Sequence, residues 1–175
     1  VTRHHLSEDT RKKALDLGEI RISLLHATYS AGPAAVRVRD TWLAMAERPD
    51  LVEHIFAFNG DDPISAENDE ISTGCAGDPM PGRVTAVRNW NNAAAASIGG
   101  LLMVVADDLT PQDMGWDRKL RELVGSLDPT EVAFALKVRD GPRPDEHLMR
   151  HPVISRAYYR QYGLFDPRYD GIGAD

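Results

Sequence analysis

Apolar and polar positions divide this chain into segments of two kinds. Short, largely apolar runs occupy residues 20–27, 52–58, 101–106 and 132–138, and each is bounded by turn-forming residues. Such runs predict buried strands. Between them lie longer segments whose apolar residues are spaced by three and four, the period of a helix with one buried face. The pattern therefore predicts strands and helices that alternate along the chain.

Residues that commonly start helices precede the predicted helices. Gly32-Pro33 opens the first, residues 84–98 form the second, and Thr110-Pro111 opens the third, since proline suits an early helical position. We also expect a short strand near residues 71–73 and a short helix that runs through Tyr162 to a stop at Gly163. The buried helical faces are expected to comprise Ala35, Val38, Trp42 and Met45, then Val87, Trp90, Ala94 and Ile98, then Trp116, Leu120, Leu123 and Leu127.

Alternating strands and helices, with strands apolar on both faces, predict an α/β fold with a mainly parallel sheet flanked by helices on both faces. We expect one domain over residues 20–175, preceded by a polar tail or surface helix over residues 1–19. Neither end of the chain looks like a natural terminus, so a longer protein is expected. In such sheets, ligands bind where the strands end. The residues at these ends are Thr28-Tyr29, Asn59 to Asp62, and Asp107-Asp108.

Composition narrows the class of protein. The 175 residues are 42% hydrophobic and 27% charged, which is typical of a globular protein. No apolar run approaches the roughly 20 residues that cross a membrane, and no secretory leader is recognisable. The single Cys75 fits a reducing compartment, so we expect a cytoplasmic protein. The net charge of −7 argues against nucleic-acid binding, which needs a basic face.

Asp107-Asp108 is the most informative pair in the sequence. Two adjacent carboxylates at the end of an apolar strand are costly unless a cation lies between them. Mg²⁺ or Mn²⁺ prefers oxygen ligands and bridges nucleotide diphosphates. The pair therefore indicates an enzyme that handles nucleotide phosphates. The alternative is that the two residues only cap the helix after Thr110.

Other polar residues are candidates for the nucleotide. Arg83 and Arg88 offer forked donors that match phosphate oxygens, or they are ordinary surface arginines. Asn89 either bonds a ribose or sugar or caps its helix. Asp61 and Asp62 either contact the base or ribose or form a turn.

Five motifs, taken in chain order, resemble those of GT-A fold glycosyltransferases of the family 2 type. The resemblance covers residues 20–175. It implies nucleotide contacts from Thr28-Tyr29 and from the loop that begins at Asn59, and a metal motif of the DXD type. The metal motif has Ala106 where a strict D-X-D has its first Asp, so we expect Asp108 to bind metal directly and Asp107 to support it. The motifs are Thr28-Tyr29, Asn59-Gly60-Asp61-Asp62, Arg88-Asn89, Ala106-Asp107-Asp108 and residues 163–175.

The resemblance implies a metal-dependent, inverting glycosyltransferase of the hexosyltransferase type. Such an enzyme moves a sugar from a nucleotide diphosphate-sugar donor to a hydroxyl acceptor. Inversion needs a carboxylate that takes the acceptor proton, and Asp175 is our candidate for this general base; the alternative is a frayed terminal residue. His147 and His151 are further candidates near the acceptor or the metal.

Two other functions remain open. A nucleotidyltransferase of related architecture would make sugar nucleotides, and it usually carries a glycine-rich, basic loop after the first strand. Here that loop, residues 30–33, has one glycine and no lysine. A non-catalytic nucleotide-sugar binding module would keep the metal site and lose the base.

Overall fold

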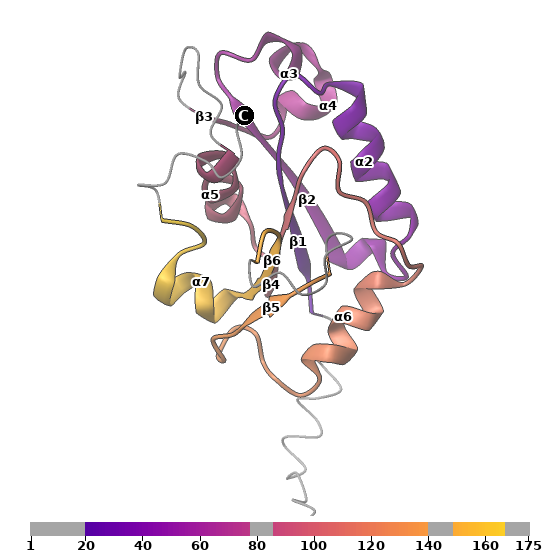
Figure 1. The fold of residues 1–175 in the computed structure, drawn as a ribbon, viewed down its shortest axis with the longest axis vertical. Coiled ribbons are helices and arrows are strands. Elements are labelled where there is room, and N and C mark those ends of the chain that lie inside the picture. The colour runs from indigo at the N-terminus through magenta and orange to yellow at the C-terminus, as the bar shows by residue number, and fades with distance from the viewer. Residues whose placement is uncertain (1–19, 78–85, 140–148, 167–175) are drawn as a thin grey trace, which may run out of the picture.

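The computed structural model describes residues 20–77, 86–139 and 149–166 (Figure 1). Its strands form a six-stranded sheet in the order β3-β2-β1-β4-β6-β5. Strands β1 to β4 are parallel to one another, whereas β6 is antiparallel to both β4 and β5. The strands are β1 (Ile22–Ala27), β2 (Val52–Asn59), β3 (Cys75–Gly77), β4 (Leu101–Val105), β5 (Ala135–Lys137) and β6 (Pro152–Ser155).

Helices cover both faces of this sheet. Figure 1 shows α2 and α6 on one side and α5 and α7 on the other. In the part of the chain that the structure describes, no helix is long and apolar enough to cross a membrane. The helices are α2 (Pro33–Ala44), α3 (Pro63–Glu67), α4 (Asp69–Ser72), α5 (Ala86–Ala96), α6 (Trp116–Val124) and α7 (Arg156–Tyr162), with a 3₁₀ turn η2 (Pro49–Leu51).

The strand side chains alternate between two buried layers. Leu24 of β1 packs in the layer beneath α2 and α6, which also contains Trp42 and Trp116. Its neighbour Leu25 packs in the opposite layer with Ala93 of α5. All six residues of β1 are buried, as expected for the centre of a parallel sheet. The predicted α/β architecture is therefore confirmed.

The region between β2 and α5 differs from the prediction. Residues 71–73, predicted as a strand, lie at the end of helix α4, and the strand β3 begins only at Cys75. The cause is a helix cap: the Asn68 side chain accepts from the backbone N–H groups of Glu70 and Ile71. The predicted tail of residues 1–19 lies outside the described residues.

The third predicted helix also begins later than expected. Helix α6 starts at Trp116 after Gly115, whose φ of +66° suits glycine. Trp116, Leu120 and Val124 form the buried face, so the expected burial of Leu123 and Leu127 was wrong: their exposed fractions are 69% and 43%. The buried residues of α6 are spaced by four from Trp116, so the buried face includes Val124 in place of Leu123.

Candidate functional site

The carboxyl ends of β1, β2, β3 and β4 meet at one edge of the sheet, because these strands are parallel. The chain segments that leave this edge contain Thr28, Asn59 and the Asp107-Asp108 pair. Helix α5 follows β3 and so begins at the same edge, with Arg88 and Asn89 in its first turn. The structure therefore brings together four of the predicted motifs.

Asp107 and Asp108 are the central residues of a turn. The backbone N–H of Leu109 donates to the carbonyl of Ala106 at 3.1 Å and closes it. Asp108 is exposed, and the Asp107 side chain is 32% exposed. Because α6 begins only at Trp116, the pair caps no helix, which excludes the alternative reading of these residues.

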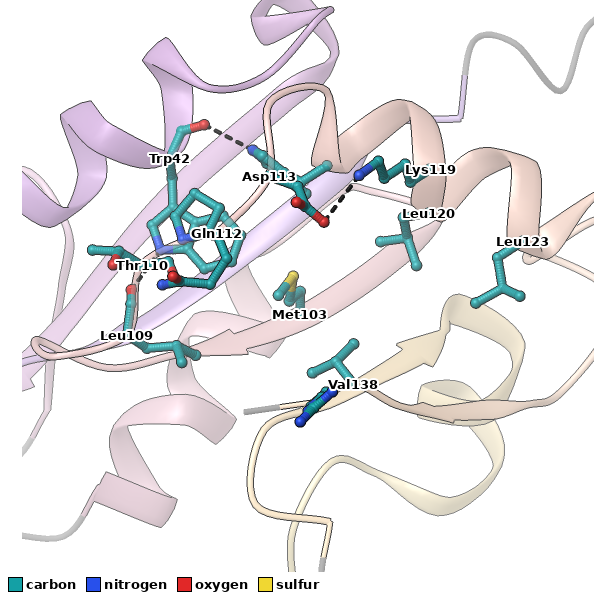
Figure 2. A pocket seen from close by; sticks show the side chains of 13 residues that line it. Trp42, Met103, Leu109, Thr110, Gln112, Asp113, Lys119, Leu120, Leu123 and Val138 are labelled. Atoms are coloured by element: carbon teal, nitrogen blue, oxygen red, sulfur yellow. Dashed lines mark hydrogen bonds and ion pairs between the residues drawn. The ribbon is translucent and has the colours of Figure 1, made fainter. Parts of the chain in front are cut away.

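Two tryptophans hold the backbone on either side of this turn. The indole N–H of Trp90, on α5, donates to the carbonyl of Val105 at 2.8 Å. The indole N–H of Trp42, on α2, donates to the carbonyl of Leu109 at 2.7 Å (Figure 2). These helices lie on opposite faces of the sheet, so both layers fix the position of the two aspartates.

A buried histidine also contacts the turn. Nε2 of His26, on β1, lies 3.0 Å from Oδ1 of Asp107, and its Nδ1 lies 2.9 Å from Nε2 of His54 on β2. Burial first, and then the neighbouring His26 and Arg39, lower the pKa of His54 to about 2. Neither histidine was identified from the sequence as a site residue. Each is a polar residue within a largely apolar strand, which could have marked it as a candidate.

The donor set of the turn suits a hard divalent cation. Such ions are commonly held by one or two carboxylates, with water and substrate phosphate filling the other positions. His26 contacts one oxygen of Asp107, which leaves its other oxygen and the exposed Asp108 carboxylate as possible donors to a ligand. Within residues 20–77, 86–139 and 149–166, no three His, Cys, Asp or Glu side chains form a complete metal cluster. The residues present therefore fit a metal shared with a phosphate ligand.

The predicted nucleotide residues form an inner and an outer group. In the inner group, Nδ2 of Asn89 donates to Oδ1 of Asn59 at 3.1 Å, and both side chains are buried. Oγ1 of Thr28 and Oδ1 of Asn89 are buried without a hydrogen-bond partner among the described residues. Buried polar atoms are rarely left unpaired, so these two mark where a polar partner would be accommodated. In the outer group, Tyr29 is 44% exposed and Asp61 is exposed.

Asp62 has a structural role. It is fully buried, caps α3, and accepts from the backbone N–H of Ser30 at 2.8 Å and from the hydroxyl of Ser65. Burial alone raises the pKa of Asp62, but the hydrogen bonds from Ser65, Ser30 and Ile64 outweigh it and hold the pKa below its usual value. The turn interpretation is therefore correct for Asp62. It joins the loop after β1 to the loop after β2.

The remaining candidates lie at the α5 side of the edge. Arg88 is half-buried and takes part in further contacts of the fold. The His151 ring packs edge-on against Trp90, with centroids 6.3 Å apart. Asn91 exchanges two hydrogen bonds with the backbone of Phe165, at 3.0 and 3.1 Å, and so fixes the start of the glycine-rich C-terminal motif at α5. The other candidates, Arg83, His147 and Asp175, lie outside the described residues.

An apolar pocket of about 340 Å³ adjoins the segment that follows the aspartate turn. Figure 2 shows Leu109, Thr110 and Gln112 on one side of it, α6 on another, and Val138 opposite. Its rim carries the ion pair between Asp113 and Lys119, with Oδ2 and Nζ 2.9 Å apart. The exposed Leu123 lines this pocket, which accounts for an apolar side chain outside the core.

Comparison with known proteins bears on the fold. No protein-family model and no curated protein matches this chain. Among solved structures, it is similar to the mannosyltransferase PcManGT from Pyrobaculum calidifontis, in complex with GDP-Man and Mn²⁺, with a TM-score of 0.57 and 15% identity. The match covers 84% of this chain and 48% of the mannosyltransferase. The chain has the GT-A fold.

A second match is weaker and adds no argument. It is glucosyl-3-phosphoglycerate synthase from Mycobacterium tuberculosis, in complex with Mn²⁺, UDP and phosphoglyceric acid. Here the TM-score is 0.46 and the identity 18%, over 78% of this chain and 49% of the synthase. The chain thus spans about half the length of each structure. The resemblance expected from the five motifs is confirmed at the level of the GT-A fold.

Proposed function

We propose that this chain is the donor-binding part of a metal-dependent, inverting glycosyltransferase that moves a hexose from a nucleotide diphosphate-sugar to a hydroxyl acceptor. The observation that carries the proposal is the turn containing Asp107 and Asp108, fixed at the carboxyl edge of a GT-A sheet by side chains from both layers. The mannosyltransferase with the same fold was solved with a nucleotide-sugar and Mn²⁺, which supports this choice.

The two aspartates would hold Mn²⁺ or Mg²⁺, with Asp108 in direct contact and Asp107 in support. When bound, the cation supplies positive charge to the diphosphate leaving group. Tyr29 and Asp61 are exposed at this edge and would contact the nucleotide. Thr28 would offer its unpaired hydroxyl to the nucleotide.

Behind these residues, the buried Asn59–Asn89 pair would keep the floor of the nucleotide site in place. Arg83 and Arg88 would bind the diphosphate through their guanidinium groups. Asp175 would take the proton from the acceptor hydroxyl as that oxygen attacks the sugar carbon. Cys75 is a free thiol, which supports a reducing compartment, the cytoplasm, as the location.

Calorimetry tests donor binding directly. The chain is titrated with UDP-, GDP- and dTDP-linked sugars, each with and without Mn²⁺. We expect one base to be preferred and Mn²⁺ to be required, and we expect Asp108→Asn to lose the metal-dependent part of the binding. No binding to any donor in the presence of Mn²⁺ would overturn the proposal.

A second experiment separates transfer from binding. Asp175→Asn is expected to abolish transfer while the donor still binds; unchanged transfer would exclude Asp175 as the base. NMR of the product reports whether the anomeric configuration is inverted. Formation of a sugar nucleotide from a nucleoside triphosphate and a sugar phosphate would instead identify a nucleotidyltransferase. Donor binding without turnover on any acceptor would identify a binding module.

A further inference from the structure

Two histidines lie side by side in the interior of the sheet, where neither the fold nor the donor site accounts for them. His26 has no exposed surface, and the ring of Phe56 packs against both imidazoles, with centroids 5.0 Å from His26 and 4.5 Å from His54. A buried imidazole costs free energy unless its nitrogen atoms are hydrogen-bonded. Most of their neighbours on the same layer are apolar, and the charged Arg39 lies over the Phe56 ring. An aliphatic side chain at position 26 would therefore pack at lower cost.

The two hydrogen bonds connect residues in or just after three neighbouring strands, perpendicular to the strand direction. His54 lies on β2, His26 on the neighbouring β1, and Asp107 follows β4 on the other side of β1. The chain of contacts therefore begins inside the sheet and ends at the aspartate turn.

The two contacts fit one arrangement of the ring protons. An ionised carboxylate only accepts hydrogen bonds, so Nε2–H of His26 donates to Asp107. With one proton on each imidazole, both contacts are hydrogen bonds when Nδ1 of His26 accepts from Nε2–H of His54. Nδ1 of His54 is then unprotonated. That atom is buried and has no partner among the described residues, and the low pKa of His54 agrees with a neutral ring.

We propose that His26 is a positioning residue for the metal site: it holds Oδ1 of Asp107 against the sheet and so presents the other carboxylate oxygen to a divalent cation. His54 fixes the tautomer of His26 that can donate. This inference rests on the proposed function, because it assigns the histidines to the same metal site. Partners that orient metal-binding groups in this way typically change metal affinity by about 10- to 100-fold when they are removed.

The first test reads the ring protons of the wild-type chain without any ligand. Long-range ¹H–¹⁵N NMR spectra of the histidine side chains distinguish a proton on Nε2 from one on Nδ1. We expect Nε2–H for both His26 and His54. A proton on Nδ1 of His26 would overturn the inference, whether or not the protein binds a nucleotide.

The second test uses two substitutions that preserve different nitrogen positions. The amide of Gln reaches the place of imidazole Nε2, and the amide of Asn reaches that of Nδ1. His26→Gln keeps a donor for Asp107, whereas His26→Asn loses it. Mn²⁺ affinity, measured from the electron paramagnetic resonance signal of free Mn²⁺ in the presence of GDP or UDP, should fall about 10- to 100-fold in His26→Asn. In His26→Gln it should stay close to the wild-type value.

Phe56→Leu is the matched control. It disturbs the packing around both imidazole rings but removes neither the His54–His26 nor the His26–Asp107 hydrogen bond. It should lower stability without weakening Mn²⁺ binding. Equal Mn²⁺ affinity for the Gln and Asn variants, or an equal loss in Phe56→Leu, would overturn the positioning role. If neither variant folds, a Mg²⁺ titration of the wild type decides: the Nε2 resonance of His26 should shift as Asp107 binds the cation, and an unchanged resonance overturns the inference.

The outcomes separate this inference from the function on which it rests. Mn²⁺ binding that is indifferent to His26→Asn overturns the positioning role alone. A wild-type chain that binds neither Mn²⁺ nor any nucleotide overturns the metal-dependent function and the positioning role together, while the ring-proton reading still reports whether the hydrogen-bond chain exists.

Discussion

The indole N–H groups of Trp42 and Trp90 bond main-chain carbonyls at the two ends of the aspartate turn. Each bond lies outside the sheet ladder, so the turn depends on side chains from α2 and α5 for its position. A site that must hold two carboxylates at a fixed separation needs such support, because the carboxylates repel each other before a cation binds.

Trp90→Phe should test this support. The variant keeps an aromatic ring but leaves the carbonyl of Val105 without its donor, which costs about 1–3 kcal/mol in stability. We expect that loss in urea unfolding, together with weaker Mn²⁺ binding in calorimetry.

The control is Ser155→Ala, which leaves the backbone N–H groups of Phe134 and Tyr158 without the hydroxyl oxygen that accepts from them. Ser155 pairs with Leu101, at the end of β4 far from the turn. The substitution should cost similar stability and leave Mn²⁺ binding unchanged. Equal weakening of Mn²⁺ binding in both variants would mean that the Trp90 effect is only a general loss of stability.

His54 should make stability depend on pH. Its pKa is about 2 in the folded chain, against an ordinary value of 6.5. The unfolded chain therefore binds a proton that the folded chain does not, so the stabilisation is complete above pH 6.5 and is lost as the pH falls towards 2. Between pH 7 and pH 5 we expect a loss of about 2 kcal/mol.

His54→Gln keeps a side-chain donor and removes the titration, so its unfolding free energy should fall less over the same pH range. Urea unfolding at pH 7, 6 and 5 measures both curves. Parallel curves would show that His54 is protonated as readily in the folded chain as in the unfolded one.

At the scale of elements, the junction between α5 and β4 has little spare room. The Glu53 carboxylate accepts from the backbone N–H groups of Ile98 and Gly99 and from the hydroxyl of Ser23. A Cβ atom on Gly99 would lie 2.3 Å from Oγ of Ser23 and 2.9 Å from the carbonyl oxygen of Arg21. The strand that delivers the aspartates is therefore positioned by a junction that only glycine fits.

Gly99→Ala should lower the free energy of unfolding by about 3 kcal/mol, at the upper end for an overpacked site. Gly115→Ala is the control: the nearest atom, Oε2 of Glu47, is 3.5 Å away, and only the left-handed backbone at φ +66° and ψ +30° opposes the substitution, at about 1 kcal/mol. Denaturant unfolding of both variants gives the comparison, and an equal cost would remove the steric argument.

The sequence predicted some elements better than others, for physical reasons. The strands β1, β2 and β4 are largely apolar, and α2 and α5 carry regular stripes, so pattern alone located them. The expected burial of Ile98 was wrong: it is 72% exposed, because α5 ends at Ala96. Helix α4 and strand β3 are too short to show a period, and a local cap at Asn68 decides their boundary. The start of α6 depends on the left-handed backbone of Gly115, which no hydrophobic pattern reveals.

For the whole molecule, chain order was the useful signal for the site. Thr28, Asn59, Asn89 and the aspartates come together because parallel strands share one edge. The histidine chain was hidden because positions 26, 54 and 107 have no sequence spacing in common. The pairing of β1 with β2 on one side and with β4 on the other brings them within hydrogen-bonding distance.

Ligand binding should therefore stabilise the chain as a unit. Free nucleotide at 100 times its dissociation constant adds about 2.7 kcal/mol, which raises the melting temperature of a chain of this size by about 5–10 °C. Thermal unfolding with Mn²⁺ and the preferred nucleotide should show this shift. Asp108→Ala should abolish it, and a shift that survives the substitution would place the ligand elsewhere.

The two indole hydrogen bonds to the aspartate turn have a practical consequence. Trp42 and Trp90 are two of three tryptophans in the chain, and both touch the backbone at the ends of the aspartate turn. Intrinsic emission should therefore respond to a paramagnetic ion at the turn, with Mn²⁺ quenching it and Mg²⁺ leaving it bright. The native chain would then report occupancy of the site by optical titration, without a label and before any sugar donor has been identified.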